Sequence, residues 1–231
     1  MKKIRTIITL IFIFTLQLFF AQKEVKKPQE AFDILFKSFV KDDKAAQKSL
    51  NDYMRPTVEG QDMYQFNPES NEEQINIMVN NFSVNYPQSF VKTNKADMRK
   101  YVEMLVGNFR KAEYKIKSVK LVDNEYDEGK KIAEITYNIT FKVPQKLSEE
   151  QIKESEKLNM KNAKPEDFKK TLAMMIDSLK NASITVMKEQ QFSLYELVEG
   201  DKTYYYNGSP DQLVSDNIDF YLDNVNFSDP K

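Results

Sequence analysis

The sequence predicts an α+β fold in which amino-terminal helices pack on an antiparallel sheet of about four strands, with a helical insertion between strands. Three observations predict it. Apolar residues repeat with helical spacing through the first half of the chain, alternate strictly from Ile135 to Val143, and return to helical spacing in a charged stretch at 148–181. Helices followed by an interrupted meander are typical of the α+β class, here as one domain over 29–225.

The first predicted helix follows Pro28, which suits the first turn of a helix. Its apolar residues fall at i, i+3, i+4, i+7 and i+8, the stripe of an amphipathic helix: Phe32, Leu35, Phe36, Phe39 and Val40. Further helices are predicted over three ranges: 43–54, 72–86 and 95–111. A polar loop with Gly60 and Pro68 separates the second from the third.

The pattern then changes to that of strands. A strand with one irregular step is predicted over 114–121, and it forms a hairpin with 135–143 through the turn at 123–129. After the insertion, strands are predicted at 184–198 and 203–206, although 184–199 could hold one strand or two. A short helix over 210–222 and a tail at 226–231 complete the chain.

The first 21 residues have the parts of a secretory signal peptide. Lys2, Lys3 and Arg5 form a basic head, 7–20 is an apolar run, and Ala21 is a small cleavage residue. The run is shorter than the roughly 20 apolar residues of a spanning helix. We therefore expect export to the periplasm or the medium, with 22–28 as a short linker and no stable membrane span after cleavage. An uncleaved anchor is the alternative, because Phe19 lies where a small residue is usual.

Composition narrows the chemistry. The chain has no His and no Cys, and only 5 Gly, so the usual neutral-pH base, thiolate chemistry and glycine-rich phosphate loops are absent. Removal of the signal takes away three of the 34 basic residues and none of the 35 acidic residues, which leaves a net charge of −4. Such a balance argues against nucleic-acid binding. We expect no cofactor, no metal and no catalytic residue.

Three sequence patterns are candidate functional sites, and each also has a simpler structural explanation. The segment Asp123–Gly129 with Glu134 has oxygen ligands spaced as in a calcium loop, but its glycine is seventh rather than sixth, which favours a solvated hairpin turn. Ser-x-x-Lys occurs three times, at the frequency expected by chance. Asp216, Asp219 and Asp223 share one face of the last helix, where a solvated acidic side is the favoured interpretation.

Three segments resemble those of the NTF2-like, or cystatin-like, secreted bacterial proteins of unknown function. They are the opening helix Phe32–Val40, the hairpin strand Ile135–Val143 and the closing strand Asp201–Tyr206, which follow the same order as in that group. The resemblance implies a curved sheet that wraps the helices into a cone with a pocket. Some members use this pocket for binding and others for catalysis.

Four tyrosines are the predicted ligand-binding residues: Tyr137, Tyr204, Tyr205 and Tyr206. On a strand, Tyr204 and Tyr206 point to one face and Tyr205 to the other, and Tyr137 lies on a neighbouring strand. A tyrosine offers an apolar ring with a hydrogen-bonding hydroxyl. We therefore expect a noncatalytic module with a tyrosine-bearing pocket, which takes a small apolar ligand or a protein partner.

Two other classes remain open. One is an enzyme that uses carboxylates or tyrosine in the same pocket, and a buried Asp or Glu beside Tyr137 or Tyr205 would favour it. The other is a binder of a protein partner, such as an inhibitor or immunity factor. Its working surface would be the outer face of the sheet or the charged stretch 148–164.

Overall fold

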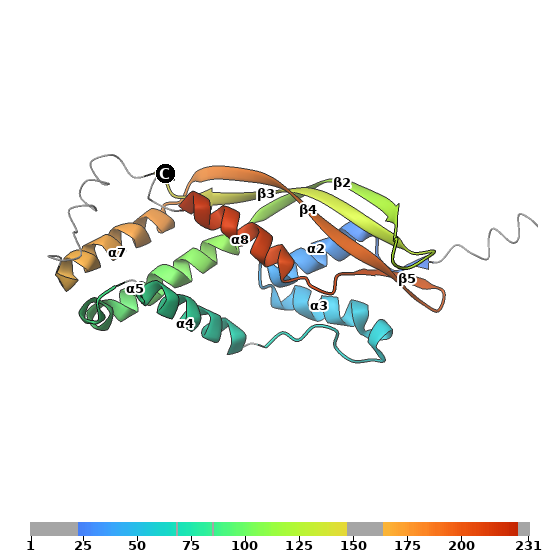
Figure 1. Cartoon of the computed structure of the whole chain (residues 1–231), viewed down its shortest axis with the longest axis horizontal. Helices are drawn as coiled ribbons and strands as arrows, with labels where there is room; N and C mark the ends of the chain where they lie inside the picture. The colour runs from blue at the N-terminus through green and yellow to red at the C-terminus, as the bar shows by residue number, and fades with distance from the viewer. Residues whose placement is uncertain (1–22, 68, 85, 147–163, 226–231) are drawn as a thin grey trace, which may run out of the picture.

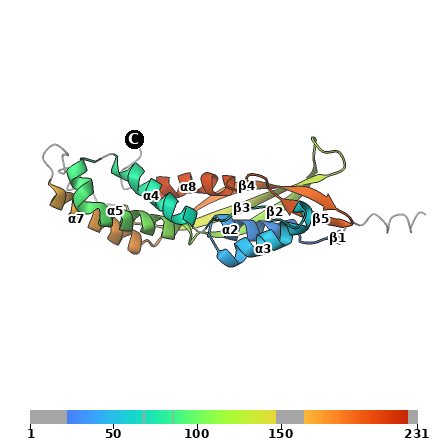
Figure 2. The ribbon, with the colours of Figure 1, turned by 90° about the horizontal axis from the view of Figure 1, so that it is seen from below.

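The computed structural model describes residues 23–67, 69–84, 86–146 and 164–225, and it has an elongated shape (Figure 1). One end holds the sheet with helices α2 (Pro28–Phe39) and α3 (Lys44–Met54) beside it. The helices α4 (Glu69–Ser83), α5 (Gln88–Phe109) and α7 (Pro165–Lys180) extend to the other end, and the second view shows the same division (Figure 2). The predicted α+β class is confirmed.

The sheet contains four antiparallel strands: β2 (Glu113–Asp123), β3 (Lys131–Val143), β4 (Ile184–Glu199) and β5 (Lys202–Tyr206). With the two-residue strand β1 (Lys23–Glu24), the order across the sheet is β1-β5-β4-β3-β2. The register of β2 against β3 shifts between Ile116 and Ser118, which confirms the irregular step predicted there. The range left open in the sequence is one strand, because β4 pairs with β3 continuously from Ile184 to Tyr195.

The linker predicted at 22–28 is partly a strand. The two residues of β1 (Lys23–Glu24) pair in parallel with Lys202 and Thr203 of β5, and the Val25 amide donates to the Thr203 carbonyl at 3.0 Å. The Lys26 ammonium lies 5.8 Å from the centroid of the Tyr53 ring. These contacts attach the segment to the sheet. They also pair part of the β5 edge, which would otherwise be open.

The other helices follow the predicted order. A 3₁₀ turn, η1 (Arg55–Val58), continues from α3, and α8 (Gln212–Val225) is the last helix. The described part of the predicted insertion 148–181 forms α7, which packs along α5. The predicted signal peptide at 1–21, the predicted tail at 226–231 and residues 147–163 of the predicted insertion lie outside the described residues.

Helix α5 begins earlier than predicted. It starts at Gln88 and changes direction at Asn94, whose backbone is non-helical with φ −117° and ψ 15°. The Asn94 side-chain amide donates to the Phe90 carbonyl at 3.0 Å and to the Pro165 carbonyl at 3.1 Å. Asparagine competes with the backbone for such bonds. The kink therefore coincides with the predicted start at Lys95, and it fastens α5 to the first turn of α7.

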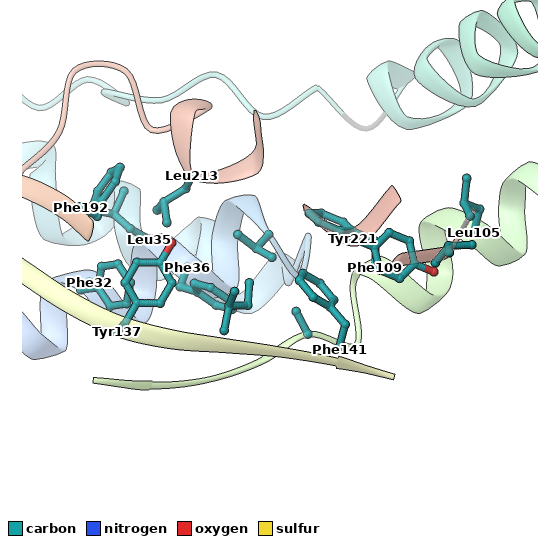
Figure 3. Packing of buried hydrophobic residues seen from close by; sticks show 14 of the residues in the cluster. Phe32, Leu35, Phe36, Leu105, Phe109, Tyr137, Phe141, Phe192, Leu213 and Tyr221 are labelled. Atoms are coloured by element: carbon teal, nitrogen blue, oxygen red, sulfur yellow. The ribbon is translucent and has the colours of Figure 1, made fainter. Parts of the chain in front are cut away.

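The core lies on one face of β3. Ile135, Tyr137, Ile139 and Phe141 are each at most 1% exposed, whereas Lys142 on the opposite face is exposed. Helices α2 and α8 and the end of α5 pack on the buried face, and Figure 3 shows their rings along the strand. The centroid of the Phe32 ring is 4.9 Å from that of Tyr137, and the Tyr221 ring is 5.1 Å from Phe141. The alternation read from the sequence is thus a division between core and solvent.

Within the part of the chain that the structure describes, no helix has the length and apolar character needed to cross a membrane.

We expect Phe141→Ala to lower the free energy of unfolding by about 3–5 kcal/mol, because it opens a cavity where rings of α5 and α8 meet β3. The neighbouring Lys142→Ala, on the exposed face, should change it by about 0.5 kcal/mol or less. Urea denaturation of both variants tests this. Equal losses would show that the two faces of β3 do not divide core from solvent as described.

Candidate functional site

Tyr137 is part of the core. Its ring is 1% exposed and packs against α2, and its hydroxyl accepts a hydrogen bond from the Asn217 side-chain amide of α8 at 3.0 Å. A buried tyrosine that has such a partner stabilises the packing of α8 on the sheet. Its hydroxyl therefore has a structural contact within the protein.

The three consecutive tyrosines lie on β5, and two of them are buried. The Tyr204 ring packs 5.5 Å from the Tyr53 ring of α3. The Tyr205 amide donates to the Tyr53 hydroxyl at 2.7 Å, and its own hydroxyl donates to Glu24 at 3.0 Å. Tyr206 is half-buried beside Tyr195, with 6.2 Å between the ring centroids. None of the four predicted tyrosines lines either of the two cavities described next.

The larger cavity has a volume of about 590 Å³, within the range of small-molecule sites. We call it the apolar cavity. It lies between α8 on one side and α4, the end of α2 and the last turn of α5 on the other, with residues 65–67 at its edge. Its apolar wall consists of Phe39, Val40, Phe66, Met78, Leu105, Val106, Phe109, Val214, Ile218, Tyr221 and Leu222. Most of these side chains remain partly exposed although they border the core.

Helix α8 contributes two adjacent stripes of residues, which are apolar except for Asn217. One stripe is fully buried against the sheet and consists of Leu213, Asn217, Tyr221 and Val225. The other follows it by one residue, is half-buried and lines the cavity: Val214, Ile218 and Leu222. Residues four apart lie above one another on a helix, so each stripe keeps a constant direction. The helix thus covers the sheet with one side and forms the cavity wall with the next.

Asp42 organises the polar end of the apolar cavity. Its backbone is left-handed, with φ 53°, a conformation that Asp tolerates better than most residues. Its carboxylate accepts from the Gln47 amide and from the Lys44 ammonium, each at 2.8 Å, and pairs with Arg110 of α5 at 3.2 Å. The turn between α2 and α3 is therefore joined to the end of α5.

A second cavity of about 520 Å³ adjoins the first. We call it the polar cavity. The two share five lining residues: Lys44, Gln47, Gln65, Phe66 and Asn67. The rest of its wall is mainly charged or polar and consists of Lys48, Asn51, Arg55, Asp62 and Tyr64. The two cavities therefore differ in character and meet at one common wall.

Hydrogen bonds hold the shared wall at residues 65–67. Asn51 of α3 pairs with the Tyr64 backbone in both directions, donating to its carbonyl at 2.9 Å and accepting from its amide at 3.0 Å. The Tyr64 hydroxyl donates to the Asn207 carbonyl at 2.9 Å. The Phe66 ring packs on Phe39 with 5.1 Å between centroids. The loop between η1 and α4 is thereby fixed to α2, α3 and the end of β5.

Most charged groups in the described residues lie at the surface, whereas Asp42 is partly buried. The buried polar side chains there are neutral, namely Ser38, Gln47, Asn51, Asn94, Thr203, Asn207 and Asn217. The Glu24 carboxylate beside Tyr205 belongs to an exposed residue. Among the residues that the structure describes, no three His, Cys, Asp or Glu side chains are grouped as a metal site. Burial raises the pKa of the Tyr221 hydroxyl at the cavity wall, so this group stays protonated at neutral pH.

The two acidic segments considered as sites in the sequence have the structures favoured there, namely a solvated helix face and a hairpin turn. Asp216, Asp219 and Asp223 are exposed on the solvent side of α8. The segment that begins at Asp123 is a hairpin turn, in which Lys130 pairs with Asp127 at 2.6 Å and Lys131 pairs with Asp123. Lysines therefore neutralise part of its charge from within the same hairpin.

Sequence reasoning missed the residues of both cavities. The wide apolar arc of the last helix was a usable signal, because burial against a sheet needs one stripe and Leu213 to Leu222 carries two. Residues 65–67 had no such signal. Their place depends on the pairing of Asn51 with Tyr64, thirteen residues apart.

The chain was compared with protein-family models, curated proteins and solved structures, and nothing matches.

The stability of the protein should fall between about pH 10 and pH 12. Burial raises the pKa of Tyr64 to about 12 and that of Tyr137 to about 12, the latter despite the Asn217 hydrogen bond. The folded state therefore favours the neutral phenol, so its contribution is complete below the unfolded pKa near 10 and is lost as the pH rises to the folded value. Urea unfolding across this window measures the loss.

Tyr64→Phe provides the control for this prediction. The variant lacks one of the titrating phenols, so its stability should decline less steeply over the same pH window than that of the unmodified protein. An unfolding free energy that stays constant up to pH 12 in the unmodified protein would contradict the burial of these hydroxyls.

Proposed function

We propose that this protein is a noncatalytic binding protein whose ligand is a small, largely apolar molecule held in the apolar cavity. One observation carries the proposal. A cavity of about 590 Å³ is lined by partly exposed apolar side chains from four helices, and Phe39, Met78, Ile218 and Leu222 are among them. A ligand that covers these side chains removes apolar surface from water, which is the main driving force of such binding.

The chemistry of the wall supports binding rather than catalysis. An acid–base catalyst needs a titratable group in reach of the substrate with a pKa suited to its task. The Asp42 carboxylate at the cavity wall is instead engaged by Lys44, Gln47 and Arg110. The other carboxylate of the wall, Asp211, belongs to an exposed residue at the start of α8.

The two alternative classes stay predictions. For an enzyme with a carboxylate beside Tyr205, Glu24 accepts a hydrogen bond from the Tyr205 hydroxyl, and Glu24 is exposed on the edge strand β1. A protein-partner binder that acts through the charged stretch 148–164 would use residues that lie, except for Lys164, outside the described residues. The resemblance to NTF2-like proteins also stays a prediction.

We further propose that the protein is exported and acts in the periplasm or outside the cell. The basic head at Lys2, Lys3 and Arg5 and the apolar run at 7–20 support this, as does the small residue Ala21. The described part of the chain begins two residues later, at Lys23, and its first residues pair with β5. Cleavage after Ala21 would leave this pairing intact.

Binding of straight-chain primary alcohols tests the proposed ligand. Each added methylene should tighten binding about fourfold until the cavity is full, because burial of a methylene contributes about 0.8 kcal/mol. Isothermal titration calorimetry below the solubility limit of each alcohol measures this. Ile218→Asp should weaken binding by about tenfold or more, because it places a charge in the apolar wall.

Asp219→Asn is the matched control. It changes the neighbouring residue on the solvent side of α8 and should leave alcohol binding within about twofold of the unmodified protein. Absence of alcohol binding to the folded protein, shown to be folded by circular dichroism, would refute the proposed function.

Export is tested on protein expressed with its full amino terminus in a bacterial host. Intact mass spectrometry of the exported fraction should give a mass that begins at Gln22. A retained Met1 would contradict cleavage and support an uncleaved anchor.

A further inference from the structure

We propose that the ligand is a single-chain amphiphile with an anionic head group, whose chain occupies the apolar cavity and whose head lies in the polar cavity near Lys44, Lys48 and Arg55. This inference rests on the proposed function and adds the chemical class of the ligand. Three observations support it: the shared wall of the cavities, their contrasting linings, and the exposed ion pairs of Lys48 and Arg55.

The shared wall makes one elongated site from two cavities. Lys44 and Gln47 project from the first turn of α3, and residues 65–67 close the wall from the loop before α4. Because the same five side chains border both spaces, a molecule in the apolar cavity that extends past them enters the polar cavity. An extended ligand with two unlike ends suits this arrangement better than a compact one.

The linings change character along the site. The stripe of α8 and the residues of α4 and α5 make the far end apolar, so it favours a hydrocarbon chain. Around the polar cavity the charged lining residues are three cations, Lys44, Lys48 and Arg55, and the carboxylate Asp62. The excess of cations in this lining favours an anion over a cation of the same size.

The cations have partners that an anionic head group can replace. Lys48 pairs with Asp52 at 2.5 Å, and Arg55 pairs with Asp52 at 2.8 Å and with Asp62 at 2.6 Å. Both members of these pairs are exposed, the Lys48 and Arg55 side chains at 78% and 44% and the Asp52 and Asp62 side chains at 41% and 55%. Exposed pairs of this kind contribute little, so exchange of a carboxylate costs little. Asp52 itself does not line the polar cavity.

A carboxylate or phosphate head group matches these donors. The Arg55 guanidinium can bind either group through two parallel hydrogen bonds, and the two ammonium groups add charge on the α3 side. The volume of the apolar cavity, about 590 Å³, suits one alkyl chain of a small molecule. The ligand class is therefore a fatty acid or another single-chain acidic amphiphile.

The experiment compares three probes of equal chain length: dodecanoate, 1-dodecanol and dodecylammonium. Calorimetry at low salt and below the micellar concentration should show dodecanoate binding about tenfold tighter than dodecanol, and dodecylammonium binding weakest. Added sodium chloride should narrow the difference between dodecanoate and dodecanol, because salt screens exposed charges.

Two variants locate the head group. The double variant Lys48→Gln/Arg55→Gln should bring dodecanoate to within about twofold of dodecanol when both probes are measured on that variant. Lys120→Gln is the matched control, because Lys120 forms an exposed pair with Glu134 on the sheet, away from both cavities. This control should retain the full preference for dodecanoate.

The outcomes separate this inference from the proposed function. Equal binding of dodecanoate and dodecanol, or tighter binding of dodecylammonium, would overturn the anionic head group and leave the apolar ligand in place. Persistence of the dodecanoate preference in the double variant would overturn the position of the head group. Failure of all three probes to bind folded protein would overturn the proposed function itself.

Discussion

The structure depends on the burial of one face of β3. Apolar residues alternate with polar residues along this strand, so helices pack on only one side of the sheet. The apolar residues are Ile135, Tyr137, Ile139 and Phe141. Phe141 is the point where they converge, because its ring lies 5.6 Å from Phe109 of α5 and 5.1 Å from Tyr221 of α8. Since both helices meet the same strand residue, their relative position is fixed where the apolar cavity begins.

The apolar cavity forms because these helices diverge after they contact β3. Helices α4, α5 and α7 extend away from the sheet, whereas α8 runs along it (Figure 1). Apolar residues that face this divergence, such as Val106 and Ile218, border the core but stay partly exposed. A single helix, α8, therefore has two roles, because the stripe through Leu213 and Tyr221 holds the sheet while the neighbouring stripe forms the wall of a site.

The polar side of the site is built from local turns. Asp42, whose backbone is left-handed, follows α2, and its carboxylate interacts with Lys44, Gln47 and Arg110. Asn51 positions the Tyr64 backbone and so the shared wall after it. The apolar cavity and the polar cavity thus share side chains that hydrogen bonds and ion pairs hold in place. The proposed recognition of a molecule with two unlike ends rests on this arrangement.

The α+β class, the helix order, the β2 irregularity and the exposed and buried faces of β3 could be predicted from the sequence, because these depend on local periodicity. The sequence placed the tyrosines on strands, but it could not place their rings. Tertiary contacts place the Tyr137 hydroxyl against the Asn217 amide, pack Tyr204 and Tyr205 around Tyr53, and make an edge strand of Lys23–Glu24. The two cavities likewise could not be predicted from the sequence. Their walls come from α3, α8 and the loop at 65–67, and no local sequence pattern shows which distant surfaces come into contact.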